Sequence, residues 1–477
     1  MNLSIKAQTN QKSRFFYLSV STLFLLSNIT SINAQEGPNT DTQDGPSIDS
    51  VNLQELNETQ QNSADAIGTA CVQGPEVNDA NFQARCDAFA IANGGPDNIT
   101  NLRVTENAEV ANALQIVSPE QTVAPGTQAS KTGAGHLSNV TASISTRMRQ
   151  LRAGLDNVQF AGIDLFHNGI AVADGQSGGA AGDHNISSLG VWFNGNYNFG
   201  SVESTFEQIG FKFDNWGGTF GADYRLSDAF IAGAAFSYLG TDANIASSRG
   251  GVDSDSYTGS LYATFYPLDN LYIDAIASYG GSEYDISRQI QYSIVDPNIP
   301  GGQDTVNTTA NGSPDGDQYM FGIGAGYNLQ IDALTLSPYG RFNYLETEID
   351  SYDENGGDGW GQHFSDQKIR SMTTAVGARA NYALSLPFGV TTLQVRGEWV
   401  HEFKDSKRKF STFYLGDGNK NAYDIVTIGP DRNYFIVGTA LTAGFGHGIS
   451  TFVSYDALVG HSFVDSHRIT AGARLEF

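Results

Sequence analysis

Residues 468–477 alternate between apolar and polar side chains. Successive side chains of a β-strand point to opposite faces of its sheet, so this segment predicts a strand with one apolar and one polar face. Taken alone, the alternation also fits a half-buried strand in the sheet of a soluble protein. The apolar face of the predicted strand consists of Ile469, Ala471, Ala473, Leu475 and Phe477.

The same alternation recurs about a dozen times upstream, with aromatic residues near the segment ends. In one such segment the charged residues Arg396, Glu398 and Glu402 all fall on one face. An arginine or lysine facing lipid at the bilayer midplane costs about 2–4 kcal/mol, so charges confined to one face favour a transmembrane β-barrel. We expect strands at 188–199, 211–226, 229–241, 255–266, 271–287, 317–329, 334–349, 367–385, 390–411, 431–445, 450–460 and 466–477.

The connections between these segments alternate in length, which is a second and independent signal. Short periplasmic turns and longer surface loops are typical of outer-membrane barrels, and an even strand count leaves both barrel ends on the periplasmic side. We therefore predict an all-β fold, an antiparallel twelve-stranded transmembrane β-barrel. The tight turns are at 226–228, 267–270, 386–389 and 446–448, and the long polar connections, expected to be solvated loops, are at 288–316, 350–366 and 412–430.

The N-terminus has the pattern of a secretory signal peptide. Three basic residues within the first 14 precede a mostly apolar stretch at 15–29, which is too short to span a membrane comfortably. Ala34 supplies the small residue expected at a cleavage site, so we expect a signal peptide at 1–34 that directs the chain to the general secretion machinery. A retained anchor helix is the alternative.

Residues 35–125 form a short N-terminal region without an internal repeat. Its first part is rich in Asp, Gln, Asn, Ser and Thr, which favours a loosely ordered segment, and a helical pattern follows at 81–92. Cys71 and Cys86 are the two cysteines of the chain, and in an exported protein such a pair predicts a disulfide. Closing a loop of roughly 15 residues would stabilise the fold by about 3 kcal/mol.

A polar helix is expected between this region and the barrel, over 126–153, followed by a Gly/Ala-rich connector that ends near 186. Because the helix is polar nearly all round, it is either enclosed in a polar channel or a solvated linker. In the first case its arginines should approach acids of the barrel lumen such as Asp274 or Glu476. The arginines near its C-terminal end are Arg147, Arg149 and Arg152.

The composition argues against several other functions. A formal net charge of −25 should repel nucleic acid. Residues 175–179 match the letters of the Gly-x-Ser-x-Gly elbow of hydrolases, but they lie in the connector instead of between a strand and a helix. Acid-rich stretches such as 350–358 lack the spacing of a dedicated calcium loop. We therefore expect no enzymatic activity, no cofactor and no metal site.

A further signal comes from five blocks between residue 187 and the C-terminus, at 214–217, 221–228, 336–344, 430–434 and 474–477. In this order and at these spacings they resemble the autotransporter β-domain, the translocator of type V secretion. The resemblance implies a twelve-stranded barrel, a helix through its pore, an N-terminal passenger and insertion by the barrel assembly machinery, which would read the last strand. The passenger here is short, and the chain lacks the Asn-Asn pair at which self-cleaving members cut.

The sequence therefore predicts a translocator in the Gram-negative outer membrane that displays residues 35–125 at the cell surface from a barrel at 187–477. Expected partners are outer-membrane lipid and lipopolysaccharide, and the ligand of the displayed region stays open. Two alternatives remain. One is a structural or adhesive barrel that acts through its surface loops and exports nothing, and the other is a diffusion channel.

Overall fold

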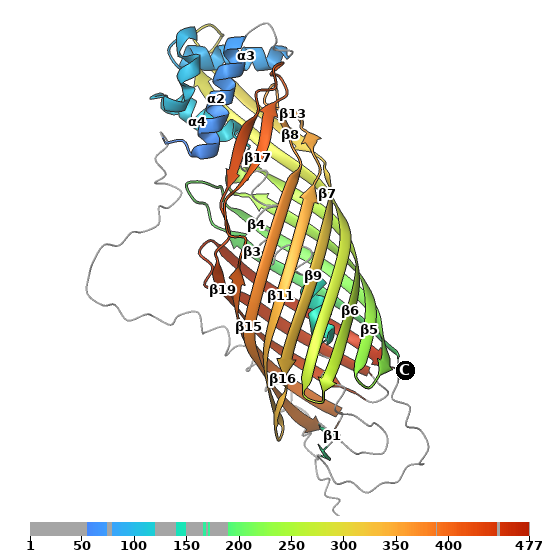
Figure 1. Cartoon of the computed structure of the whole chain (residues 1–477). Helices are drawn as coiled ribbons and strands as arrows, with labels where there is room; N and C mark the ends of the chain where they lie inside the picture. The colour runs from blue at the N-terminus through green and yellow to red at the C-terminus, as the bar shows by residue number, and fades with distance from the viewer. Residues whose placement is uncertain are drawn as a thin grey trace, which may run out of the picture. The chain divides into compact units, whose positions relative to one another are not determined.

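The computed structural model shows a closed barrel and a group of helices (Figure 1). The predicted signal peptide lies outside the described part of the chain. The residues that the structure describes are 55–73, 79–119, 140–148, 166–167, 170–171, 189–387, 389–445 and 449–476.

Twelve antiparallel strands pair in succession, and the last pairs with the first, so the barrel has no open edge. In the closing pair, Ile469 lies opposite Tyr197. The predicted twelve-stranded barrel is confirmed. Its strands are β3 (Leu189–Val202), β4 (Phe211–Ser227), β5 (Phe230–Ile245), β6 (Gly250–Leu268), β7 (Leu271–Val295), β9 (Asp315–Tyr327), β11 (Leu334–Ile349), β15 (Gln367–Leu386), β16 (Gly389–Glu402), β19 (Asn433–Gly444), β20 (Ile449–Val459) and β21 (Val464–Glu476).

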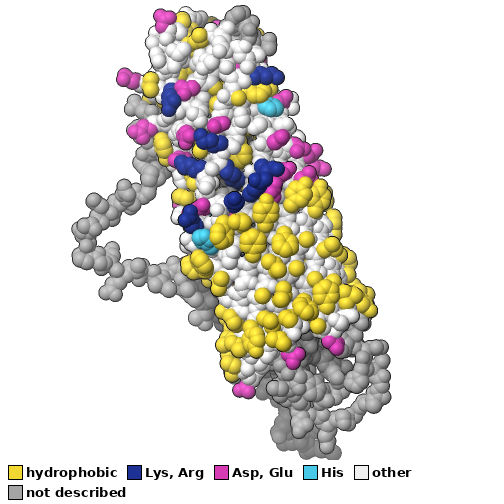
Figure 2. Space-filling view, viewed as in Figure 1, with side chains coloured by type: hydrophobic (Ala, Val, Ile, Leu, Met, Phe, Trp, Pro, Cys, Tyr) yellow, Lys and Arg dark blue, Asp and Glu magenta, His cyan; other side chains and the backbone are white. Residues whose placement is uncertain are grey.

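The outward side chains of these strands form an apolar belt (Figure 2). On β16, for example, Val395 is 52% exposed, whereas Glu398 is buried on the lumen side. Aromatic rings from neighbouring strands contact one another on the outer surface. The ring of Trp216 lies 5.4 Å from that of Tyr238, which lies 5.3 Å from that of Tyr257. A closed cylinder with this belt and aromatic row fits a lipid bilayer.

Replacing Val395 by arginine is expected to destabilise the barrel by about 2–4 kcal/mol, because a charged side chain near the middle of β16 would face hydrocarbon. The measurement is the denaturant midpoint at which the unboiled protein loses its folded mobility on a gel. Gln394→Arg is the matched control, because Gln394 contacts Asn381 on the lumen face. An equal loss in both variants would contradict this orientation of the strand.

Several strands continue beyond the belt, at the barrel end opposite the tight turns (Figure 1). The far half of β7 pairs with β8 (Gln303–Gly312), which pairs with β13 (Asn355–Gly356). A separate four-stranded sheet contains β12 (Tyr352–Asp353), β14 (Gln362–Phe364), β17 (Arg408–Tyr414) and β18 (Tyr423–Thr427). We call these segments the strand extensions.

The long connections are therefore not irregular loops throughout, since each of them contributes strands. The predicted strand over 390–411 ends at Glu402, and its last residues belong to β17. The remaining short elements are η3 (Ala246–Ser248), β10 (Leu329–Ile331), which pairs with β11, and the two-residue strands β1 (Phe166–His167) and β2 (Ile170–Ala171).

Residues 55–73 and 79–119 form a group of short helices that we call the helical cap. The predicted helix over 81–92 corresponds to α3, whose first turn is capped by the Asp79 side chain. Asn107 caps α4 in the same way. In the part of the chain described, no helix combines the length and apolarity needed to cross a membrane. The helices are α2 (Glu58–Gln73), α3 (Ala80–Ala92), η2 (Pro96–Val104) and α4 (Ala108–Val117).

Candidate functional site

A helical segment, residues 140–148, lies inside the barrel (Figure 1). We call it the pore segment. Val140, Ile144 and Met148 recur at four-residue spacing and are buried in one apolar cluster with inward side chains of β3, β5, β6, β7 and β9. The prediction of a helix that is polar nearly all round is therefore wrong for these residues. The rest of the predicted helix lies outside the described residues.

Arg147 holds the pore segment against the lumen wall. It donates from Nε and Nη2 to the two carboxylate oxygens of Asp223, at 2.6 and 2.5 Å. The side chains of the pair are only 1% and 4% exposed. The Tyr262 hydroxyl donates to Asp223 at 2.9 Å and accepts from the Trp192 indole at 2.7 Å. A buried bidentate ion pair of this kind has strict geometry, so it sets the position of the pore segment in the lumen.

Two glycines make room for this network. A Cβ atom on Gly190 would lie 2.6 Å from Nη2 of Arg147, and one on Gly221 would lie 2.5 Å from the Trp192 ring. Both distances are shorter than van der Waals contact allows. Gly221 thus leaves space for the Trp192 indole, which donates to the Tyr262 hydroxyl, and that hydroxyl in turn donates to the Asp223 carboxylate.

The acid beside Arg147 differs from the two that the sequence suggested. Asp274 accepts a hydrogen bond from Thr264 at 3.0 Å. Asp223 was missed, although it faces the lumen two residues after a glycine in an early strand block. Outside the described residues lie the Glu476 side chain, Arg149, Arg152 and Phe477.

The predicted assembly strand is β21, between β20 and β3. Its apolar residues alternate to the outside, and Ile469 and Leu475 are 42% and 36% exposed. Ala471 and Ala473 share that outward face. The structure thus places four of the five predicted residues on the lipid side of the strand.

A small cavity of about 70 Å³ lies between the pore segment and the barrel wall. Thr141 of the segment lines it, together with charged wall residues. Arg341 donates to Glu398 at 2.6 Å, and Arg396 donates to Asp456 at 2.7 Å. These pairs fit a wet lumen. Among the residues described, no cluster of three or more His, Cys, Asp or Glu side chains is placed to hold a metal ion.

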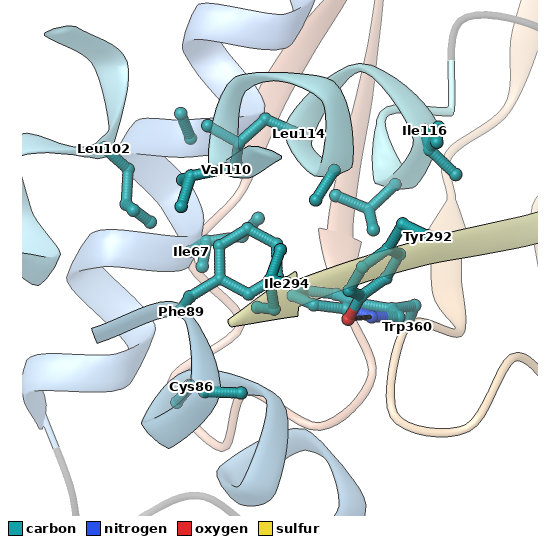
Figure 3. Packing of buried hydrophobic residues seen from close by; sticks show 14 of the residues in the cluster. Ile67, Cys86, Phe89, Leu102, Val110, Leu114, Ile116, Tyr292, Ile294 and Trp360 are labelled. Carbon is teal, nitrogen blue, oxygen red and sulfur yellow. Dashed lines mark hydrogen bonds between the residues drawn. The ribbon is translucent and has the colours of Figure 1, made fainter. Parts of the chain in front are cut away.

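At the far end of the barrel, the helical cap packs on the strand extensions through a cluster of aromatic rings (Figure 3). Trp360 is fully buried at its centre. Its ring lies 5.3 Å from Phe89, 5.8 Å from Phe82 and 5.5 Å from Tyr414. Phe82 and Phe89 come from α3, whereas Trp360 and Tyr414 come from connections that were predicted to be solvated.

A buried ion pair lies beside these rings. Arg288 of β7 donates to both carboxylate oxygens of Glu354, at 2.9 and 2.6 Å, and neither side chain is more than 1% exposed. Burial by itself would lower the pKa of the Arg288 guanidinium, but the charge and hydrogen bonds of Glu354, together with Tyr414 and Tyr423, raise that pKa overall. The expectation that 350–358 is a solvated acidic stretch is therefore wrong at Glu354.

The disulfide between Cys71 and Cys86 joins α2 to α3 within the cap. The residue next to it, Arg85, donates to Asp304 of β8 at 2.6 Å and to Asp358 at 2.9 Å. The disulfide thus lies beside the contact between the cap and the extensions.

A closed barrel with a lipid-facing belt and a segment of its own chain in the lumen defines an outer-membrane β-barrel. The chain belongs to the autotransporter beta-domain family, whose model matches residues 191–456. The resemblance seen in the sequence is therefore confirmed, and the protein is an outer-membrane autotransporter barrel.

Individual relatives match the chain over shorter stretches. Outer membrane protein A of Rickettsia conorii is 27% identical over 226 residues, which is 46% of this chain and 10% of that protein. Esterase EstA of Pseudomonas aeruginosa is 26% identical over 188 residues, 39% of this chain and 26% of that protein. The chain thus spans a small part of each. The translocator domain of NalP from Neisseria meningitidis aligns with 71% of this chain and 98% of its own length, at 18% identity and a TM-score of 0.48.

Proposed function

We propose that the chain exports its own N-terminal region through the outer membrane and displays it at the cell surface as the helical cap. The supporting observation is the path of the chain. Residues 140–148 lie in the lumen, and the helical cap packs on the strand extensions at the barrel end opposite the tight turns. In outer-membrane barrels the short turns face the periplasm, so the extensions and the cap would lie outside the cell.

We also infer that the chain is not an enzyme and that its partners are those of membrane assembly. The apolar belt would contact outer-membrane lipid and lipopolysaccharide, and the barrel assembly machinery would recognise β21. The general secretion machinery would deliver the chain to the periplasm. The segment at 140–148 supports a closed pore over a diffusion channel, because its side chains fill part of the lumen.

Surface exposure of the cap tests the proposal. An epitope inserted after Gly95, at the exposed turn between α3 and η2, should bind its antibody on intact cells. The matched control carries the same epitope at Asp269, in the turn between β6 and β7, and should bind antibody only in permeabilised cells. If the Gly95 epitope also requires permeabilisation, the cap is periplasmic and the chain is a barrel that exports nothing.

A further inference from the structure

The helical cap and the strand extensions share one hydrophobic core. Ile67, Leu102 and Leu114 from the cap are fully buried together with Ile290 and Ile294 from β7. Figure 3 labels four of these side chains, all but Ile290, in the same cluster as Trp360. Packing of this kind resembles the interior of a domain more than a contact between a tethered segment and a surface, because apolar side chains from both parts enclose each other.

The end of α4 is held by groups of the extensions. Arg288, besides binding Glu354, donates to the backbone oxygen of Val117 at 3.0 Å, and Gln362 donates to the same oxygen at 3.3 Å. The last carbonyl groups of a helix lack partners within the helix, and here one is bound by a buried guanidinium. Lifting the cap would remove that oxygen from Arg288 and expose the ion pair's surroundings to water.

A second line of contacts joins α2 to β18, which is the edge strand of its four-stranded sheet. Thr59 accepts from the backbone nitrogen of Val426 at 2.9 Å and donates to its oxygen at 3.3 Å. Asn62 donates to the backbone oxygen of Asp424 at 2.9 Å. The cap thus covers an exposed strand edge of the kind that otherwise binds other chains.

We propose that the strand extensions are a docking surface that holds the helical cap without help from the peptide connection. After a cut between residues 120 and 139, the cap therefore stays bound to the barrel as a separate chain. This inference rests on the proposed function for its biological setting, because a displayed cap would remain on the cell when its linker is cleaved. Its physical basis is only the shared core, the Arg288 cluster and the covered edge of β18.

The test uses the full-length protein, purified in detergent, with a site for a specific protease inserted between residues 120 and 139 and flanked by glycine and serine. After complete cleavage, the N-terminal fragment should elute with the barrel in size-exclusion chromatography. Elution of the fragment on its own would overturn the inference. Failure of the antibody test on cells would overturn surface display and leave this result unaffected, so the two proposals fail separately.

Arg288→Ala gives the sharper form of the experiment. The change leaves Glu354 buried without its partner, so the cleaved cap should bind about a hundredfold more weakly or worse and separate from the barrel. Arg370→Ala is the matched control, because Arg370 is 49% exposed and pairs with Glu346 on the surface. The unboiled gel mobility shows that the barrel is folded in both variants. Equal retention of the cap in both would overturn the role of Arg288.

Discussion

Replacing Trp360 by alanine is expected to destabilise the docked cap by about 3–5 kcal/mol while the barrel stays folded. The loss follows from the cavity that would replace a fully buried indole in contact with rings from both parts. Its Nε1 also donates to the Tyr292 hydroxyl at 2.9 Å, so the truncation leaves that oxygen without its donor. Hydrogen exchange of the α3 amides measures the effect directly, because undocking opens that helix to solvent.

The matched control for this prediction is Trp216→Ala. Trp216 is 58% exposed on the outer face of β4, so its removal should leave exchange in α3 unchanged. Barrel integrity in both variants is read from the mobility of unboiled protein. If the α3 amides of the Trp360 variant exchange as slowly as in the unchanged protein, the aromatic cluster does not hold the cap.

The barrel was predictable because its signal is local. Neighbouring side chains of a strand face lipid and lumen in turn, as Val395 and Arg396 do, so a few residues are enough to indicate both environments. Closure needs no further information, since lipid excludes an open sheet edge. The strand positions therefore followed from the period-two pattern and from the lengths of the turns.

The burial of residues in the strand extensions could not be predicted in this way, because it depends on segments that are distant in the sequence. Trp360 lies in a stretch of glycine and acid that is typical of a solvated loop, and two of its ring neighbours, Phe82 and Phe89, come from α3, more than 250 positions earlier. Glu354 likewise pairs with Arg288, which is 66 positions away. One local signal was available: Ile290, Tyr292 and Ile294 continue the alternation of β7 beyond the expected end of the strand.

The second large loss of stability is expected from changes in the ion pair that holds the pore segment. Arg147→Met and Asp223→Leu, made singly, should each lower the free energy of unfolding by about 3–5 kcal/mol. Each change leaves a charge buried in the lumen wall without its partner. The double variant should be close to neutral, since an apolar pair of similar size leaves no charge to bury. The readouts are the unfolding midpoint of the purified protein and its conductance in a planar bilayer. The conductance should rise only in the single variants.

An exposed ion pair is the control for this double-mutant cycle of Arg147 and Asp223. Arg103 and Asp65 in the cap are 51% and 47% exposed. Arg103→Met should therefore change the free energy of unfolding by less than about 1 kcal/mol. If the single lumen variants behave like this control, Arg147 does not fix the segment. If the double variant conducts as strongly as the singles, closure requires the charged pair itself. Loss in the singles with recovery in the double means that closure depends on having no unpaired charge in the wall, and the apolar stripe of Val140, Ile144 and Met148 then suffices to keep the segment in the pore.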